Sequence, residues 1–120
     1  MSGPQKVLIV EDEPLIAMML EDFLDALDRV VAGTADSVAS GLALVEAGGI
    51  DAAIMDVNLR GGETSWPIAD ALAARGIPFV LATGGAGDMI HESYRNRPIL
   101  SKPFTMDSVE KVLDSLVAAD

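Results

Sequence analysis

Carboxylates stand at the ends of two apolar runs in this sequence, where a buried strand would leave the core. Glu11–Glu13 directly follows the apolar run Lys6–Val10, and Asp56 directly follows the run Ala52–Met55. In open parallel sheets, ligands bind outside the carboxyl ends of the strands. Acids that meet there repel one another unless a cation or a proton joins them. The pattern therefore predicts a metal site or a phosphoryl site.

A hydroxyl and an amine end two further apolar runs. Thr83 follows Pro78–Ala82, and Lys102 follows Ile99–Ser101. Taken singly, each such residue has an ordinary alternative, since aspartate at a strand end is often a helix cap or turn residue. Threonine before glycine is an ordinary turn, and lysine before proline is an ordinary exposed charge. The joint placement at strand ends is what favours one shared site.

Short apolar runs alternate with amphipathic segments, which is typical of a parallel sheet built from repeated strand–helix units. The expected strands are Lys6–Val10, Arg29–Gly33, Ala52–Met55, Pro78–Ala82 and Ile99–Ser101. The five expected helices begin at Pro14, after a cap at Asp36 or Ser37, near Trp66, near Asp88, and before Val109. The pattern predicts an α/β fold with a doubly wound, five-stranded parallel sheet.

Length and composition limit the possible classes. The 120 residues predict one domain over 1–120, with no linker or repeat. The net charge of −11 argues against nucleic acid and anionic membranes as partners. The absence of cysteine excludes disulfides and thiolate sites. No apolar run approaches the ~20 residues of a membrane span, and the first residues lack a signal pattern, so we expect a cytoplasmic protein.

Four motifs match a known family in order and spacing. Val10–Pro14, Met55–Asn58, Ala82–Gly84 and Ser101–Phe104 resemble the receiver domain of two-component response regulators. The resemblance covers essentially the whole chain. It implies a flavodoxin-like receiver fold with strand order 2-1-3-4-5. It also implies a stand-alone receiver, because these residues include no output domain.

The resemblance gives the acids separate roles. It implies that Asp56 is the phosphoacceptor, a carboxylate nucleophile that takes a phosphoryl group from a phosphohistidine. The donor is a sensor histidine kinase or a histidine phosphotransfer protein. The implied cofactor is Mg²⁺, which suits an all-oxygen site. Asp12 and Asp56 would bind it through carboxylates, Asn58 through its backbone carbonyl and Glu11 through water.

The other two strand-end residues would assist the transfer. By the same resemblance, Lys102 supplies positive charge to the phosphoryl oxygens, and the Thr83 hydroxyl donates a hydrogen bond to one of them. The bond before Pro103 is expected to be cis, which would aim the lysine into the site. Such a protein is a switch that assists its own phosphorylation and dephosphorylation, and we do not expect an ordinary enzyme.

One position departs from the usual receiver pattern. Ile99 stands three residues before the lysine, where well-studied receivers carry an aromatic switch residue. The glycine-rich stretch after Thr83, which begins Gly84–Gly85, is the expected substitute, because glycine permits large backbone changes. A Thr-Gly-Gly loop without the aromatic switch resembles a receiver subgroup that works with kinases of the HWE or a related class.

The sequence leaves the output open. A stand-alone receiver can signal by protein–protein contact or drain phosphoryl groups as a phosphate sink, and we expect a monomer or weak dimer. The alternative is a receiver-like interaction module that works without phosphorylation. A flavodoxin-like cofactor binder would need a Ser/Thr/Gly-rich loop after the first strand, where Glu11–Glu13 would repel phosphate. A haloacid-dehalogenase-like phosphatase would need Asp-x-Asp there, which is missing.

Overall fold

The computed structural model describes residues 5–83, 94, 97–101 and 104–118. Its centre is a five-stranded sheet in the order β2-β1-β3-β4-β5, and all the strand pairs are parallel. The strands are β1 (Lys6–Val10), β2 (Val30–Ala35), β3 (Ala52–Asp56), β4 (Phe79–Thr83) and β5 (Ile99–Ser101). The predicted fold class and strand order are therefore confirmed.

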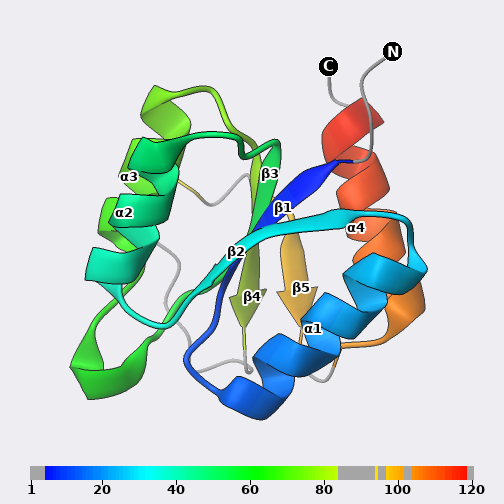
Figure 1. The fold of residues 1–120 in the computed structure, drawn as a ribbon, viewed down its shortest axis with the longest axis horizontal. Coiled ribbons are helices and arrows are strands. Elements are labelled where there is room, and N and C mark those ends of the chain that lie inside the picture. The colour runs from blue at the N-terminus through cyan, green and yellow to red at the C-terminus, as the bar shows by residue number, and fades with distance from the viewer. Residues whose placement is uncertain (1–4, 84–93, 95–96, 102–103, 119–120) are drawn as a thin grey trace.

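The helices of the described part form a layer on each face of the sheet (Figure 1). They are α1 (Pro14–Ala26), α2 (Val38–Ala47), α3 (Trp66–Ala74) and α4 (Met106–Ala118), with a short 3₁₀ turn, η1 (Arg60–Gly62), before α3. In Figure 1, α2 and α3 lie on one face, and α1 and α4 lie on the other. None of the helices in the described ranges is both long and apolar enough to cross a membrane.

A hydrophobic core lies between the sheet and each helix layer, because neighbouring residues of a strand point to opposite faces of the sheet. From β1, Leu8 and Val10 pack in the core under α2 and α3, whereas Val7 and Ile9 pack in the core under α1 and α4. Strands β3 and β4 are buried along their whole length. Their continuous apolar runs follow from this burial on both faces.

The helix boundaries have local causes in the sequence. Pro14 occupies the first turn of α1, where its missing N–H costs no hydrogen bond. The cap of α2, which the sequence left between Asp36 and Ser37, is Ser37, whose Oγ accepts a hydrogen bond from the Ser40 N–H at 3.1 Å. The helices therefore start at the edge of the sheet where the strands end.

Among the strands, the second differs most from its expected bounds. The second strand starts one residue later than predicted, at Val30, and continues to Ala35. The reason is its pairing with β1, which places Ala35 beside Val10 and lets the Glu11 N–H donate to the Ala35 carbonyl at 2.9 Å. The helix expected near Asp88 lies outside the described residues.

Candidate functional site

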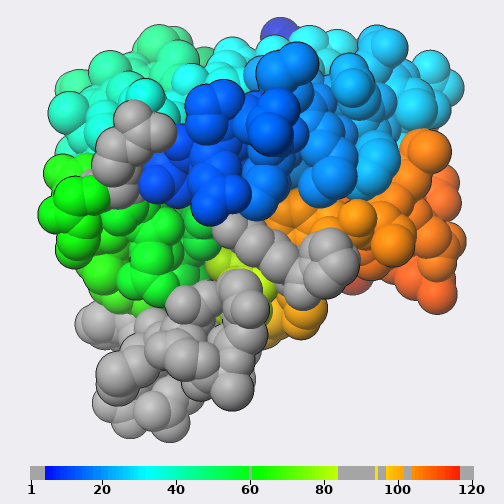
Figure 2. Space-filling view, turned by 90° about the horizontal axis from the view of Figure 1, so that it is seen from below, coloured from blue at the N-terminus to red at the C-terminus, as the bar shows by residue number. Residues whose placement is uncertain are grey.

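Three carboxylates meet at the carboxyl edge of the sheet. One oxygen from each of Glu11, Asp12 and Asp56 lies within 4.8 Å of the others. Glu11 is only 3% exposed and Asp56 only 6%, while Asp12 is half-buried. Figure 2 looks onto this end of the molecule, with α1 in blue, the loop after β3 in green and α4 in orange around it. The sequence prediction that these acids share one site agrees with this geometry.

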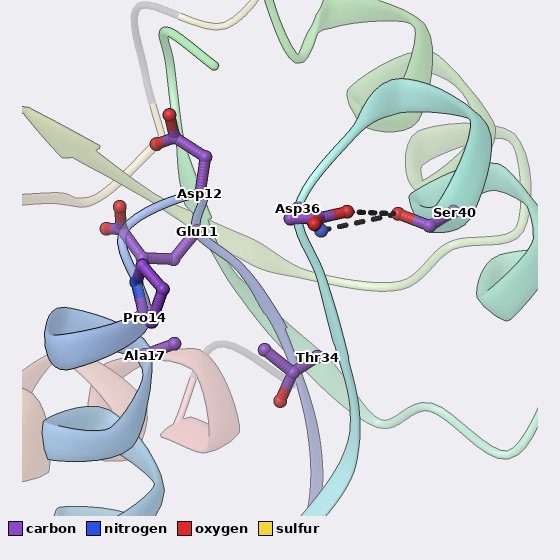
Figure 3. Close-up of a pocket in the computed structure, with 7 residues that line it drawn as sticks. All are labelled: Glu11, Asp12, Pro14, Ala17, Thr34, Asp36 and Ser40. Carbon is purple, nitrogen blue, oxygen red and sulfur yellow. Dashed lines mark hydrogen bonds between the residues drawn. The ribbon is translucent and has the colours of Figure 1, made fainter. Parts of the chain in front are cut away.

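The connection from β1 to α1 positions two of the acids. Only three residues separate Val10, the end of β1, from Pro14, the start of α1. The Glu11 backbone continues the pairing with β2, and its carboxylate accepts a hydrogen bond from the Glu13 N–H at 3.2 Å. This short connection fixes Glu11 and Asp12 at the end of the strand, and Figure 3 shows their side chains next to each other.

The third acid is fixed by the centre of the sheet. Asp56 is the last residue of β3, pairs with Ala82 of β4, and is followed by Val57, whose N–H donates to the Ala82 carbonyl at 3.3 Å. Thr83 comes one residue after that pairing, as the last residue of β4, and is 8% exposed. Thr83 therefore ends the strand next to the one that carries Asp56.

The remaining predicted site residues have different positions. Asn58 is exposed in the loop after β3, two residues beyond Asp56. Ile99 begins β5, pairs with Leu81 and is 44% exposed. Lys102, Pro103, Gly84 and Gly85, which complete the predicted site and switch, lie outside the described residues.

The donor set fits a hard divalent cation. All three clustered groups offer carboxylate oxygens, and two of them are buried, where like charges repel more strongly than in water. Magnesium prefers oxygen ligands and keeps several waters, so few protein ligands suffice. Each of the three clustered carboxylates offers one oxygen that can hold such an ion.

A cavity of about 350 Å³ opens beside this cluster, between the starts of α1 and α2. It is lined by Glu11, Asp12, Pro14, Ala17, Thr34, Asp36 and Ser40. Figure 3 shows Asp36 and Ser40 across the hollow from the two acids, joined by a hydrogen bond from the Ser40 Oγ to the Asp36 Oδ1 at 3.4 Å. Sequence reasoning considered Asp36 only as a helix cap. The feature that could have identified Asp36 as a residue of the site is its position directly after β2, which matches the position of Glu11 directly after β1.

Comparisons with known proteins agree with this architecture. The family described as "Response regulator receiver domain" matches residues 7–114. The solution structure of SdrG from Sphingomonas melonis Fr1 is 65% identical, with a TM-score of 0.88 over 98% of this chain and 99% of that chain. The BeF3-activated conformation of SdrG from Pseudomonas melonis Fr1 is also 65% identical over the same shares, with a TM-score of 0.82.

A more distant receiver has the same fold. The PhyR response regulator REC domain of Erythrobacter litoralis is 28% identical, with a TM-score of 0.83 over 97% of this chain and 92% of that chain. No curated protein matches the chain by sequence. The family match spans nearly the whole sheet, from β1 into α4, and includes the three clustered acids. The chain therefore belongs to the response regulator receiver domain family.

Proposed function

We propose that residues 1–120 form one receiver domain that accepts a phosphoryl group on Asp56 in a Mg²⁺-dependent reaction. The observation that carries this proposal is the meeting of Glu11, Asp12 and Asp56 at the carboxyl edge of a doubly wound sheet. Such an edge is where ligands bind in open α/β sheets.

Each acid has a distinct task in this proposal. An Asp56 carboxylate oxygen attacks the phosphorus of a phosphohistidine, so a P–O bond forms as the P–N bond breaks, and the imidazole nitrogen leaves with the electron pair. Asp12, Asp56 and the Asn58 backbone carbonyl would hold Mg²⁺, and Glu11 would bind it through water. When bound, the cation neutralises charge on the phosphoryl oxygens.

Two residues stabilise the transferred group. The Thr83 hydroxyl, at the end of the strand beside Asp56, donates a hydrogen bond to one phosphoryl oxygen. Lys102 supplies a positive charge to the same group, and a cis Lys102–Pro103 bond would aim the lysine toward it. Because phosphoryl transfer needs mainly positioning and charge stabilisation, these few groups are sufficient.

The donor in this proposal is a sensor histidine kinase, of the HWE or a related class, or a histidine phosphotransfer protein. The readout is a rearrangement of the loop through Thr83, Gly84 and Gly85, because Ile99 replaces the aromatic switch. The phosphorylated chain, a monomer or weak dimer, then signals through protein contact or serves as a phosphate sink.

Intact mass measurement tests the acceptor assignment. The protein is incubated with Mg²⁺ and acetyl phosphate, and the wild type is compared with Asp56→Asn. We expect the wild type to gain one phosphoryl group and the variant to gain none, because an amide oxygen is a poor nucleophile. Chelating Mg²⁺ with EDTA should abolish the gain.

Asp25→Asn is the matched control, because Asp25 is an exposed carboxylate of α1 at the opposite end from the acidic cluster. This variant should be phosphorylated like the wild type. Mg²⁺ binding without any mass gain in the wild type would contradict the proposal and favour an interaction module that works without phosphorylation. A mass gain that persists in Asp56→Asn would place the acceptor elsewhere.

A further inference from the structure

The loop after Asp56 is closed at its base by hydrogen bonds to Val57, the residue that follows β3. The Ser65 N–H donates to the Val57 carbonyl at 3.0 Å, and the Ser65 Oγ donates to the same carbonyl at 3.4 Å. Ser65 is completely buried. Figure 1 shows this loop in green, between β3 and α3. Its base is therefore attached firmly to the core.

The middle of the loop is paired with itself. Asn58 and Thr64 form an isolated antiparallel bridge, and the Leu59 N–H donates to the Glu63 carbonyl at 2.8 Å. The carbonyl of Asn58 is a proposed Mg²⁺ ligand. Its position therefore depends on the segment Glu63–Thr64, which pairs with it. Whatever holds Glu63 also holds the backbone around Asn58.

The tip of the loop gives no such support. Gly61 and Gly62 have φ angles of 76° and 81°, a left-handed conformation that favours glycine. A side chain added at either position would meet no atom within 4 Å. The tip therefore turns the chain in open space, and the attachment of the loop must come from its other residues.

The Glu63 side chain makes a contact outside the loop. Its Oε1 accepts a hydrogen bond from the Val38 N–H, the first of α2, at 3.1 Å. The Ser37 Oγ accepts a hydrogen bond from the Ser40 N–H of the same turn. The side chains of Glu63 and Ser37 therefore each accept one backbone N–H of the first turn of α2. A carboxylate at this end of a helix is favoured by the helix dipole. Glu63 thus ties the loop to the start of α2.

We propose that Glu63 is a positioning residue for metal binding, which holds the backbone around Asn58 in place by attaching the segment paired with it, around Glu63 and Thr64, to α2. The inference rests on the proposed function. Glu63 lies in the same nine-residue loop as Asn58, and its carbonyl accepts a hydrogen bond from the N–H of Leu59, the residue after Asn58. Without the link to Val38, the loop keeps its base but loses its attachment to α2.

Mg²⁺ titrations followed by two-dimensional NMR of the backbone amides test this role. In Glu63→Ala we expect Mg²⁺ to bind about fivefold more weakly, the factor that corresponds to one lost helix-capping hydrogen bond. Glu63→Gln keeps an oxygen acceptor of similar reach and should bind Mg²⁺ close to the wild-type affinity. Glu46→Ala removes an exposed carboxylate from the far end of α2 and is the matched control.

The glutamine variant separates position from charge. If Glu63 acted only through its negative charge, Glu63→Gln and Glu63→Ala would weaken Mg²⁺ binding equally, and that result would overturn the inference. Thermal midpoints of all variants report stability separately. Equal Mg²⁺ affinity in Glu63→Ala and wild type, with a lowered midpoint, would show that Glu63 is only a helix cap.

A failure of the proposed function looks different. If the wild type itself binds no Mg²⁺ and is not phosphorylated by acetyl phosphate, the proposed function and this inference both fall. If the wild type binds Mg²⁺ and only the Glu63→Ala effect is missing, the inference alone is wrong.

Discussion

At the scale of single residues, Tyr94 joins parts of the chain that are distant in sequence. Its hydroxyl donates to the Asp70 carboxylate of α3, and its ring stacks on Trp66 with centroids 5.9 Å apart. Phe79 of β4 meets the same ring edge-on at 5.3 Å. Tyr94 is buried, with 7% of its surface exposed. Its partners could not be read from the sequence, because they come from two other elements.

The surroundings of Tyr94 change its acidity. The hydrogen bond to Asp70 raises the pKa of the Tyr94 hydroxyl above 10.0, and burial and the Asp70 charge raise it further. Arg97, whose guanidinium lies 5.8 Å from the centre of the Tyr94 ring, opposes this shift in pKa. The folded state therefore prefers the protonated phenol more strongly than the unfolded chain does.

Tyr94→Phe should lower the free energy of unfolding by about 1 kcal/mol at neutral pH, because it removes this hydrogen bond. The loss should shrink as pH rises above about 10, since the unfolded wild-type chain then ionises its tyrosine before the folded protein does. Urea denaturation followed by Trp66 fluorescence, at several pH values up to about 11, measures the difference. A difference that does not change with pH would contradict the raised pKa.

At the scale of elements, α2 and α3 pack closely at a glycine. A Cβ added at Gly41 of α2 would lie 2.4 Å from the Ile68 Cδ1 and 3.0 Å from its Cγ1. Ile68 is completely buried in the core beneath these helices. The sequence predicted both helices, but the contact between Gly41 and Ile68 depends on how the two helices pack.

Gly41→Ala brings two opposing effects. Alanine in a helix interior is favoured over glycine by about 1 kcal/mol, but overpacking a core costs about 1–3 kcal/mol. Because Ile68 is completely buried and has little room to move, we expect a net loss of about 1 kcal/mol in unfolding free energy. Chemical denaturation of the variant measures it.

The double variant Gly41→Ala/Ile68→Val identifies the cause. Valine lacks the Cδ1 atom that would clash with the alanine Cβ at position 41. The double variant should therefore lose less stability than the sum of the losses in the two single variants. Ile68→Val alone should cost about 1 kcal/mol. Additive losses would mean that the close approach to Ile68 does not explain the effect of Gly41→Ala.

At the scale of the whole molecule, charge is the dominant feature. The net charge of −11 means that acidic side chains repel one another in the folded state. Three of these side chains are brought together in the acidic cluster. Any salt should therefore stabilise the protein by screening, with a Debye length of about 10 Å at 0.1 M ionic strength. A specific Mg²⁺ site should add to this general effect.

MgCl₂ should raise the thermal midpoint more than NaCl at the same ionic strength. A ligand that binds only the folded state adds about 2.7 kcal/mol at about 100 times its dissociation constant. Asp12→Asn should remove the excess and keep the NaCl effect, because the variant loses a carboxylate of the site but little net charge. Differential scanning calorimetry with EDTA as the metal-free reference checks this, and equal midpoints in the two salts would contradict it.

The sequence by itself determined the sheet, its helices and the candidate acids, because apolar periodicity and strand-end chemistry are local properties. It identified Glu11, Asp12 and Asp56 before any geometry was known. Only the tertiary structure decided where β2 ends, since pairing with β1 extends it to Ala35. It alone showed the distances among the three acids and the link from Glu63 to Val38. These features depend on strand register and helix packing, which join residues that the sequence keeps apart.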